Sequence, residues 1–495
     1  MKPHLLYEQG EFQYRGAWEN PTLVQDLELN VLLETMARHD HFIYTAMRTL
    51  LLNGDADPAV VRYRQAILED ALSDPELFYR IYVLASDVSK RAEPYQVQMR
   101  PNYHRQLPAR EKLEISVELL EVSLSKLQEL QMLGEERVRF VRSEGLKRLF
   151  QRLAEEYPES FFLQAQEHVR LLKLAVQETR LSIGARLGNG LKGARFVLRE
   201  LHADSSWPVT KKIIKKSGLS EFEHSFRGIE EAALVPVLQI VRRFIEETLE
   251  FFQLLRFEIG FYVGGTRLVE RLRQMRCPYC FPEPVPANER RLTFRGLYNP
   301  VLALNSGQRP VGNDLEADGK IRIIITGANQ GGKTTFLRSV GLAQLMMQAG
   351  LVVAADHFRA NLCDRVYSHF ARQEDDTMKS GRLDEELSRL AAILDQLTPC
   401  SLLLMNEPFA STTEREGSLI ARDLLTVCQE QNLKVLLVTH FYELAEWAYR
   451  NRTDDSAFLI AERRQDGLRS YVLKEGVPEQ TSFGQDLFRQ IIEQG

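Results

Sequence analysis

The stretch from Ile321 to Thr335 limits most strongly what this 495-residue chain can fold into. An apolar, β-branched run ends at Gly327, four residues follow, and Gly332-Lys333-Thr334 comes next. This is the G-x-x-x-x-G-K-[ST] spacing of a phosphate-binding loop. The amphipathic segment Phe336 to Gln348 supplies the helix that such a loop needs after it. Strand, loop and helix in this order predict a nucleotide-binding α/β domain rather than a chance glycine-rich turn.

Each residue type in this loop has a physical task. Glycines let the backbone turn so that successive N–H groups point at phosphate oxygens, and the helix N-terminus adds partial positive charge. Lys333 is predicted to reach the β- and γ-phosphates, and the Thr334 hydroxyl to bind Mg²⁺. The residues expected to hold ATP are Gly327, Ala328, Asn329, Gln330, Gly331, Gly332, Lys333, Thr334 and Thr335.

A second apolar run, Ser401 to Met405, ends in Asn406 and Glu407, where a phosphate-loop protein places the carboxylate that faces Mg²⁺. Asn406 stands where an aspartate is usual, and its amide oxygen adds no negative charge to a weak Mg²⁺ site. Glu407 keeps its carboxylate and is the candidate to orient the attacking water. His440, after the next apolar run, is expected to contact the γ-phosphate or that water. The expected catalytic residues are Lys333, Glu407 and His440, with slow hydrolysis because of Asn406.

The totals agree with a soluble protein of roughly three domains. The net charge of −5 gives no general attraction for nucleic acid, so any such site must be a local basic patch. Five cysteines are too few for a disulfide framework and fit reduced thiols. The chain starts without an apolar leader, and no window approaches about eighteen uncharged apolar residues. We therefore expect a cytoplasmic protein with no membrane contact.

Residues 1–275 read almost entirely as helix. Alternating Glu, Arg and Leu in long helices predicts antiparallel levers or a bundle, although several ordinary helical subdomains fit the periodicity equally well. In the last and longest helix, Gly264-Gly265 is the expected weak point. The predicted segments include one that starts at Pro58, Glu111 to Leu133, Ser160 to Leu181, and Glu230 to Gln274.

The character changes near Cys277, where prolines punctuate a linker. Short apolar runs then alternate with helices, which predicts a mostly parallel sheet covered on both faces. A hairpin is expected near the end, with Phe458 to Ala461 and Tyr471 to Leu473 joined by the turn Asp466-Gly467. The predicted strands are Ile321–Thr326, Leu351–Ala355, Ser401–Met405 and Val435–Thr439.

Taken in order, the motifs of residues 290–490 resemble the ATPase domain of the MutS mismatch-repair family. The likeness is carried by Thr326–Thr335 with its Asn329 and double glycine, Lys379-Ser380-Gly381-Arg382, Leu404–Glu407, and Thr439-His440. The resemblance implies an ABC-like P-loop domain that binds ATP and Mg²⁺ in a head-to-tail homodimer. In such a dimer, Ser380 and Gly381 of one subunit reach the γ-phosphate held by the other.

The helical half resembles the family's core, lever and clamp more faintly, with Arg62 to Asp70 as its clearest trace. The implied domains are a helical core and lever over 1–275, with a clamp-like insertion at about 130–225, and a P-loop ATPase domain over 276–495. Helices begin within the first thirty residues, so we expect a shortened member without the N-terminal mismatch-reading and connector domains. The implied partner is double-stranded or branched DNA.

Two basic clusters and a C-x-x-C sequence have both a functional and a structural interpretation. Either cluster fits phosphate-backbone contacts or a solvated helix face, and their place in the presumed clamp favours DNA. The sequence Cys277-Pro278-Tyr279-Cys280 lacks a second ligand pair for zinc and a thioredoxin-like context, so structural cysteines are expected. The clusters are Arg137, Arg139, Arg142, Lys147, Arg148 and Arg152, and Lys211, Lys212, Lys215 and Lys216.

The resulting hypothesis is a dimeric ATPase that closes on DNA, in mismatch repair or recombination control. Two alternatives stay open. Asn406 motivates a nucleotide-dependent interaction switch that hardly hydrolyses ATP. The basic clusters equally fit an ATPase that acts on structured RNA or ribosomes.

Overall fold

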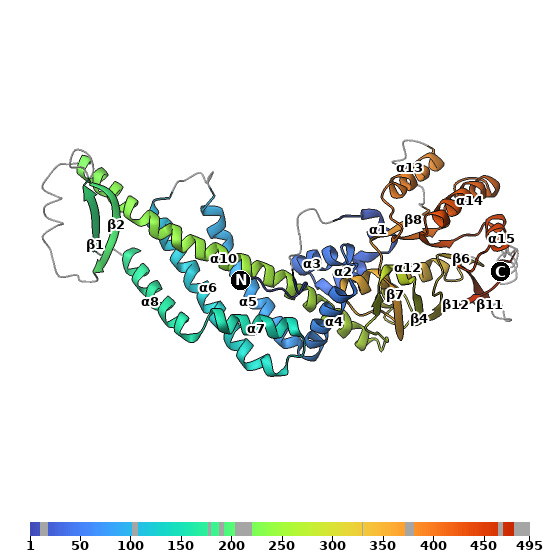
Figure 1. Cartoon of the computed structure of the whole chain (residues 1–495), viewed down its shortest axis with the longest axis horizontal. Helices are drawn as coiled ribbons and strands as arrows, with labels where there is room; N and C mark the ends of the chain where they lie inside the picture. Colours follow the sequence, from blue (N-terminus) through green and yellow to red (C-terminus); the bar gives the residue numbers. More distant parts are fainter. Residues whose placement is uncertain are drawn as a thin grey trace, which may run out of the picture. The chain divides into compact units, whose positions relative to one another are not determined.

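The computed structural model describes residues 1–9, 18–100, 107–176, 180–187, 193–202, 220–328, 330–371, 381–463 and 469–479 (Figure 1). Its contacts divide the chain into two compact units. Residues 1–5 with 74–259 form the helical unit, and residues 6–73 with 260–495 form the P-loop unit. The predicted boundary near 275 follows the change in composition, whereas by contacts residues 6–73 pack with the α/β part.

The helical unit is built mainly from long helices. Asp74 caps the first of them by accepting a hydrogen bond from the Leu77 N–H at 3.1 Å, and Pro75 occupies the first helical position. Regularly spaced leucines such as Leu113, Leu120 and Leu127 are buried. The helices are α5 (Pro75–Gln98), α6 (Ala109–Arg137), α7 (Glu144–Glu156), α8 (Glu159–Val176) and α10 (Ser220–Gln274), which continues into the P-loop unit.

A β-hairpin in this unit corrects the prediction that residues 1–275 are almost entirely helical. Helix α8 ends at Val176, not Leu181, and β1 (Arg180–Leu187) pairs antiparallel with β2 (Gly193–His202). Glycines within these segments disfavour a helix by about 1 kcal/mol each. A ladder between the two strands instead satisfies the backbone groups.

The main sheet of the P-loop unit has the strand order β12-β11-β6-β10-β9-β8. Strands β8 to β11 and β6 run parallel, and β12 pairs antiparallel with β11, as expected for the predicted hairpin. The prediction of a P-loop fold preceded by a helical part is confirmed at that level. The strands are β6 (Arg322–Thr326), β8 (Val366–Phe370), β9 (Leu402–Asn406), β10 (Lys434–Val438), β11 (Ser456–Arg463) and β12 (Arg469–Glu475).

Helices cover both faces of this sheet (Figure 1). On one face α13 (Arg382–Leu394), α14 (Glu414–Glu430) and α15 (Tyr442–Arg450) pack on a core that includes Leu403 and Met405. On the other face, α12 (Lys333–Ala349) approaches Leu404 so closely that a Cβ at Gly341 would lie 2.6 Å from it. Alternate residues of one strand therefore face opposite layers.

A second sheet, ordered β3-β7-β4-β5, packs on the far side of α12. Its Phe294 lies 6.0 Å from Phe336 of α12 between ring centroids, and nearly every residue of α12 is buried as a result. The elements are β3 (Glu283–Val285), β4 (Leu292–Leu297), α11 (Pro300–Ser306), β5 (Asn313–Glu316) and β7 (His357–Asn361).

Two predictions about the P-loop unit are wrong. Leu351–Ala355 is buried but is no strand, because it makes only the single bridge of Val353 with Cys280. Gly264-Gly265 does not interrupt α10, since these glycines serve close packing. A Cβ at Gly264 would lie 2.6 Å from the Met47 sulfur.

Four N-terminal helices complete this unit, and the last is tied to α12. The buried Arg64 donates to the carbonyl of Ala349, the final residue of α12, at 3.4 Å. Its neighbours Arg62 and Gln65 donate to the carbonyls of Pro284 and Pro282 at 3.0 and 2.9 Å. The helices are α1 (Pro21–Asp26), α2 (Leu29–Ala37), α3 (His41–Leu52) and α4 (Pro58–Ser73).

Candidate nucleotide site

The loop between β6 and α12 has the backbone shape that its glycines predict. Gly327 has φ +113°, and a Cβ there would lie 2.9 Å from the Ala461 backbone nitrogen. Gly332 has φ +90° and caps α12, so the helix N-terminus faces the loop. Both positions need glycine for their positive φ, and Gly327 needs it for space as well. Asn329 lies outside the described residues.

Lys333 turns back onto this loop. Its ammonium donates to the carbonyls of Gly327 and Ala328 at 2.8 and 3.0 Å, and the side chain is buried. Burial lowers the pKa of Lys333, the Glu407 carboxylate raises it, and the Arg469 guanidinium lowers it. Arg469 also donates to the Gln330 side-chain oxygen at 2.5 Å. Positive groups therefore gather around the loop, as an anion-binding site requires.

Thr334 and Asn406 meet at the same end of the sheet. The Thr334 hydroxyl donates to the Asn406 side-chain oxygen at 2.9 Å. Mg²⁺ in nucleotide sites uses one or two protein oxygens together with phosphates and waters, and this hydroxyl–amide pair fits that role without charge. Within the described residues no group of three His, Cys, Asp or Glu side chains forms a metal site of its own.

Glu407 and His440 follow neighbouring strands. Asn406 of β9 pairs with Val438 of β10, and the Glu407 N–H donates to the Val438 carbonyl at 2.8 Å. The His440 Nδ1 lies 4.0 Å from the Glu407 carboxylate, and both side chains are partly exposed. These residues therefore stand beside the loop with access to solvent.

A cavity of about 680 Å³ opens between the loop and two segments that the sequence analysis did not assign to ATP. Its volume suits a small-molecule ligand. No short motif in the sequence pointed to residues 306–313 or to Tyr471. The lining residues are Asn299, Leu302, Ser306, Gln308, Arg309, Pro310, Val311, Asn313, Gln330, Gly332, Lys333, Thr334, Thr335, Phe336, Ser339, Glu407 and Tyr471.

Gly381 does not join this cavity within the chain. It caps α13 and lines a separate depression with Leu383, Asp384, Leu387 and Ser411. Ser380 lies outside the described residues.

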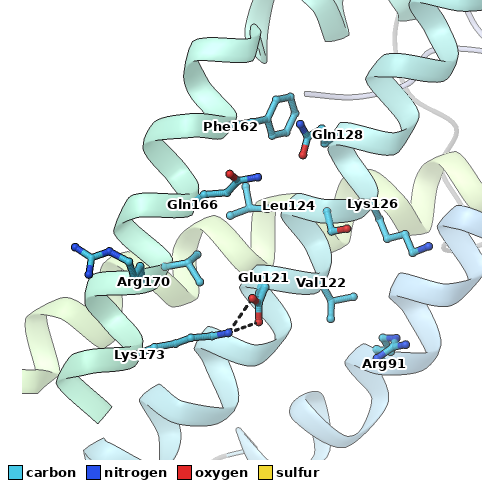
Figure 2. A pocket seen from close by; sticks show the side chains of 12 residues that line it. Arg91, Glu121, Val122, Leu124, Lys126, Gln128, Phe162, Gln166, Arg170 and Lys173 are labelled. Carbon is cyan, nitrogen blue, oxygen red and sulfur yellow. Dashed lines mark hydrogen bonds and ion pairs between the residues drawn. The ribbon is translucent and has the colours of Figure 1, made fainter. Parts of the chain in front are cut away.

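A second cavity of about 680 Å³ lies in the helical unit, between α6 and α8 (Figure 2). Its lining carries four basic side chains and one acid, and three of the basic side chains are held in ion pairs, Lys126 with Glu129 at 3.0 Å among them. Lys173 bonds to Glu121, and Arg170 pairs with Glu167 of the same helix at 2.6 Å. The loop cavity, by contrast, lies beside glycine-rich backbone and a helix N-terminus, which suit the phosphates of a nucleotide.

At least three of the six side chains in the first basic cluster form ion pairs within the helical unit. Arg137 pairs with Asp74 at 3.2 Å, and Lys147 with Glu144 at 3.0 Å. The second cluster, Lys211 to Lys216, lies outside the described residues. Neither cluster by itself identifies a DNA contact.

The cysteines are free thiols. Burial raises the pKa of Cys280 to about 11 and also raises that of Cys277. A raised pKa leaves little thiolate for redox chemistry. Among the described helices none has the length and apolar character that crossing a membrane requires.

The loop, its strand and its helix define a P-loop nucleotide-binding domain. The family model "MutS domain V" matches residues 323–490, and "MutS2 N-terminal domain" matches residues 56–275. The chain belongs to the MutS family.

Similar proteins carry two different names. The chain is 26% identical over 265 residues to a "DNA mismatch repair protein MutS" of Thermotoga petrophila, covering 53% of this chain and 33% of that protein. It is 32% identical over 169 residues to one of Chloroflexus aurantiacus, covering 33% and 18%. It is 29% identical over 197 residues to an "Endonuclease MutS2" of Streptococcus uberis, covering 39% and 25%. The chain thus matches a third or less of each of these relatives.

Proposed function

We propose that this protein is an ATPase that binds DNA as a homodimer, in mismatch repair or recombination control. One observation carries the ATPase assignment: five predicted residues border one end of the sheet beside a cavity of ligand size. They are Lys333, Thr334, Asn406, Glu407 and His440.

In the proposed reaction, water attacks the γ-phosphorus of ATP, the bond to the β–γ bridging oxygen breaks, and ADP and phosphate leave. Glu407 orients the water and accepts its proton, and His440 contacts the water or the γ-phosphate. Lys333 balances negative charge on the transferring group. Thr334 and Asn406 would hold Mg²⁺, which would neutralise further negative charge on the phosphates.

The DNA partner and the homodimer are inferred from the family. The relatives' names concern mismatch repair and a nuclease, which supports DNA rather than RNA. Gly381 faces a depression away from the chain's own loop, which fits a role for Ser380 and Gly381 at the partner subunit's nucleotide.

The first test compares ATP binding and turnover in the wild type, Lys333→Ala and the control Lys320→Ala. Lys320 donates to the Asp454 carbonyl away from the cavity. We expect Lys333→Ala to lose at least ~100-fold in turnover, since it removes charge from the phosphates, and Lys320→Ala to behave as the wild type. Unchanged binding and turnover in Lys333→Ala would refute the site.

A second candidate function is a nucleotide-dependent switch with little hydrolysis, favoured by the uncharged Thr334–Asn406 pair. Phosphate release under multiple turnover separates the two, since a switch releases less than about one phosphate per site per hour. Competition among mismatched duplex, branched DNA and structured RNA over a salt series tests the partner. Preference for structured RNA would overturn the DNA assignment.

A further inference from the structure

A buried carboxylate outside the nucleotide cavity joins three elements of the P-loop unit. Glu386 of α13 is 4% exposed. One of its oxygens accepts a hydrogen bond from the Phe409 N–H at 2.7 Å and lies 3.2 Å from His369 Nε2 of β8. The other accepts from the Ser411 hydroxyl at 3.0 Å. Two of the three contacts are made to the loop of residues 407–411, which follows β9.

This loop has a backbone that needs support. Glu407 has φ +51° and Phe409 has φ +62°, although neither is glycine. The left-handed conformation costs such residues about 1–2 kcal/mol each and persists only where neighbouring contacts hold it. For Phe409, the Glu386 carboxylate supplies one of these contacts directly at the backbone N–H.

Packing alone does not explain a carboxylate at this position. Leu383, Leu390 and Ile393 form an apolar stripe of α13 on the core, and Glu386 interrupts it. Burying an ion costs several kcal/mol, and an apolar residue of similar size is often neutral or stabilising. Burial alone would raise the pKa of Glu386, but the bonds from His369, Phe409 and Ser411 hold this pKa below its usual value. The carboxylate is thus ionised and fully engaged.

We propose that Glu386 is a positioning residue that fixes the loop of residues 407–411 and thereby the direction of the Glu407 carboxylate. The inference rests on the proposed function, in which Glu407 orients water. Ser411 also lines the depression that contains Gly381. Glu386 therefore couples that surface, where the partner's nucleotide is proposed to lie, to the hydrolytic end of the chain's own site.

The test is steady-state ATP hydrolysis by the purified full chain as wild type, Glu386→Ala, Glu386→Gln and the control Asp395→Asn. Asp395 caps the other end of α13 and is exposed. Glu386→Ala should lower kcat at least about tenfold and leave the KM for ATP within about twofold, because the residues that hold ATP are untouched. Glu386→Gln keeps an oxygen for the Phe409 N–H and should recover most of kcat. Asp395→Asn should match the wild type.

Wild-type kcat in Glu386→Ala, or a change in KM alone, would overturn the proposal. If Glu386→Ala does not fold by circular dichroism and gel filtration, Ser411→Ala and His369→Gln decide, since each removes one contact. A three- to tenfold loss of kcat in either is about what one weakened hydrogen bond costs and supports the proposal, and no loss in both refutes it. A wild type without turnover would refute the ATPase function as well, whereas an active wild type with an unaffected Glu386→Ala refutes only the positioning role.

Discussion

Lys333 and Lys434 lie at opposite ends of the main sheet, and both ammonium groups are buried. Lys333 follows the carboxyl end of β6 and lines the cavity of about 680 Å³. Lys434 begins β10 and lines a cavity of about 10 Å³, which holds one water at most. Its ammonium donates to the Asn361 side-chain oxygen and to the Arg291 carbonyl, at 3.2 Å for the latter.

The surroundings of the two lysines differ as expected if Lys333 contacts a ligand and Lys434 contacts only other parts of the fold. At the carboxyl ends, Glu407 and His440 are partly exposed and 4.0 Å apart, with room for further partners. At the amino ends, Lys434 is enclosed, and burial lowers its pKa to about 8. Desolvation alone therefore does not mark a functional lysine. A ligand-sized space beside it does.

The largest expected effect is at the carboxyl ends of the strands, where ATP is proposed to bind. Glu407→Gln should lower ATP turnover at least ~100-fold, because it removes the group proposed to accept the water proton. Binding of ATP should stay within a few-fold of the wild type, as Lys333 and the loop are intact. Glu430→Gln, at an exposed acid of α14, is the matched control. Turnover near wild type in Glu407→Gln would contradict the catalytic assignment.

At the amino ends of the strands, where Lys434 lies, the expected effect is on the stability of the fold rather than on ATP turnover. The pKa of Lys434 is about 8 in the fold against an ordinary 10.5, so between these values the unfolded chain binds the extra proton. The contribution of Lys434 to the free energy of unfolding therefore rises as the pH goes from about 8 to about 10.5, by roughly 3 kcal/mol in all.

Lys434→Met, of similar volume, removes this titration. The melting temperature of the wild type should rise relative to that of the variant between about pH 8 and about pH 10.5, with ATP binding unchanged. Thermal melting of both proteins over this pH range checks the prediction. A wild type whose pH profile matches that of Lys434→Met would contradict the assignment of the titration to Lys434.

The sequence was informative where a short motif forces the geometry. The spacing from Gly327 to Thr334 predicted the loop, and the polar ends of apolar runs predicted that Asn406 and Glu407 would meet it. Parallel strands bring their carboxyl ends together, so these residues become neighbours although more than seventy positions apart.

Other parts had no local signal. Tyr471 and residues 306–313 reach the cavity only through long-range packing, as when Asn313 accepts a hydrogen bond from the Leu473 N–H at 2.7 Å. The buried run Leu351–Ala355 has the composition of a strand but lies where no strand pairs along it. The β1–β2 hairpin was missed because the surrounding helical periodicity outweighed two short segments that contain glycine.

The smallest expected effect sharpens the comparison at Asn406. An aspartate there keeps the acceptor for the Thr334 hydroxyl and adds one negative charge where Mg²⁺ is proposed to bind. At an effective dielectric constant near 20 or above, a charge about 4 Å away contributes roughly 1–4 kcal/mol. We take the lower end because the cavity is open. About 1 kcal/mol corresponds to a roughly fivefold reduction in the Mg²⁺ concentration for half-maximal turnover. Asn432→Asp adds the same charge in the exposed turn before β10 and should leave this concentration unchanged. If both variants shift this concentration equally, the effect is one of net charge and Asn406 has no special place at the metal. A shift confined to Asn406→Asp identifies residue 406 as one that sets the affinity for Mg²⁺.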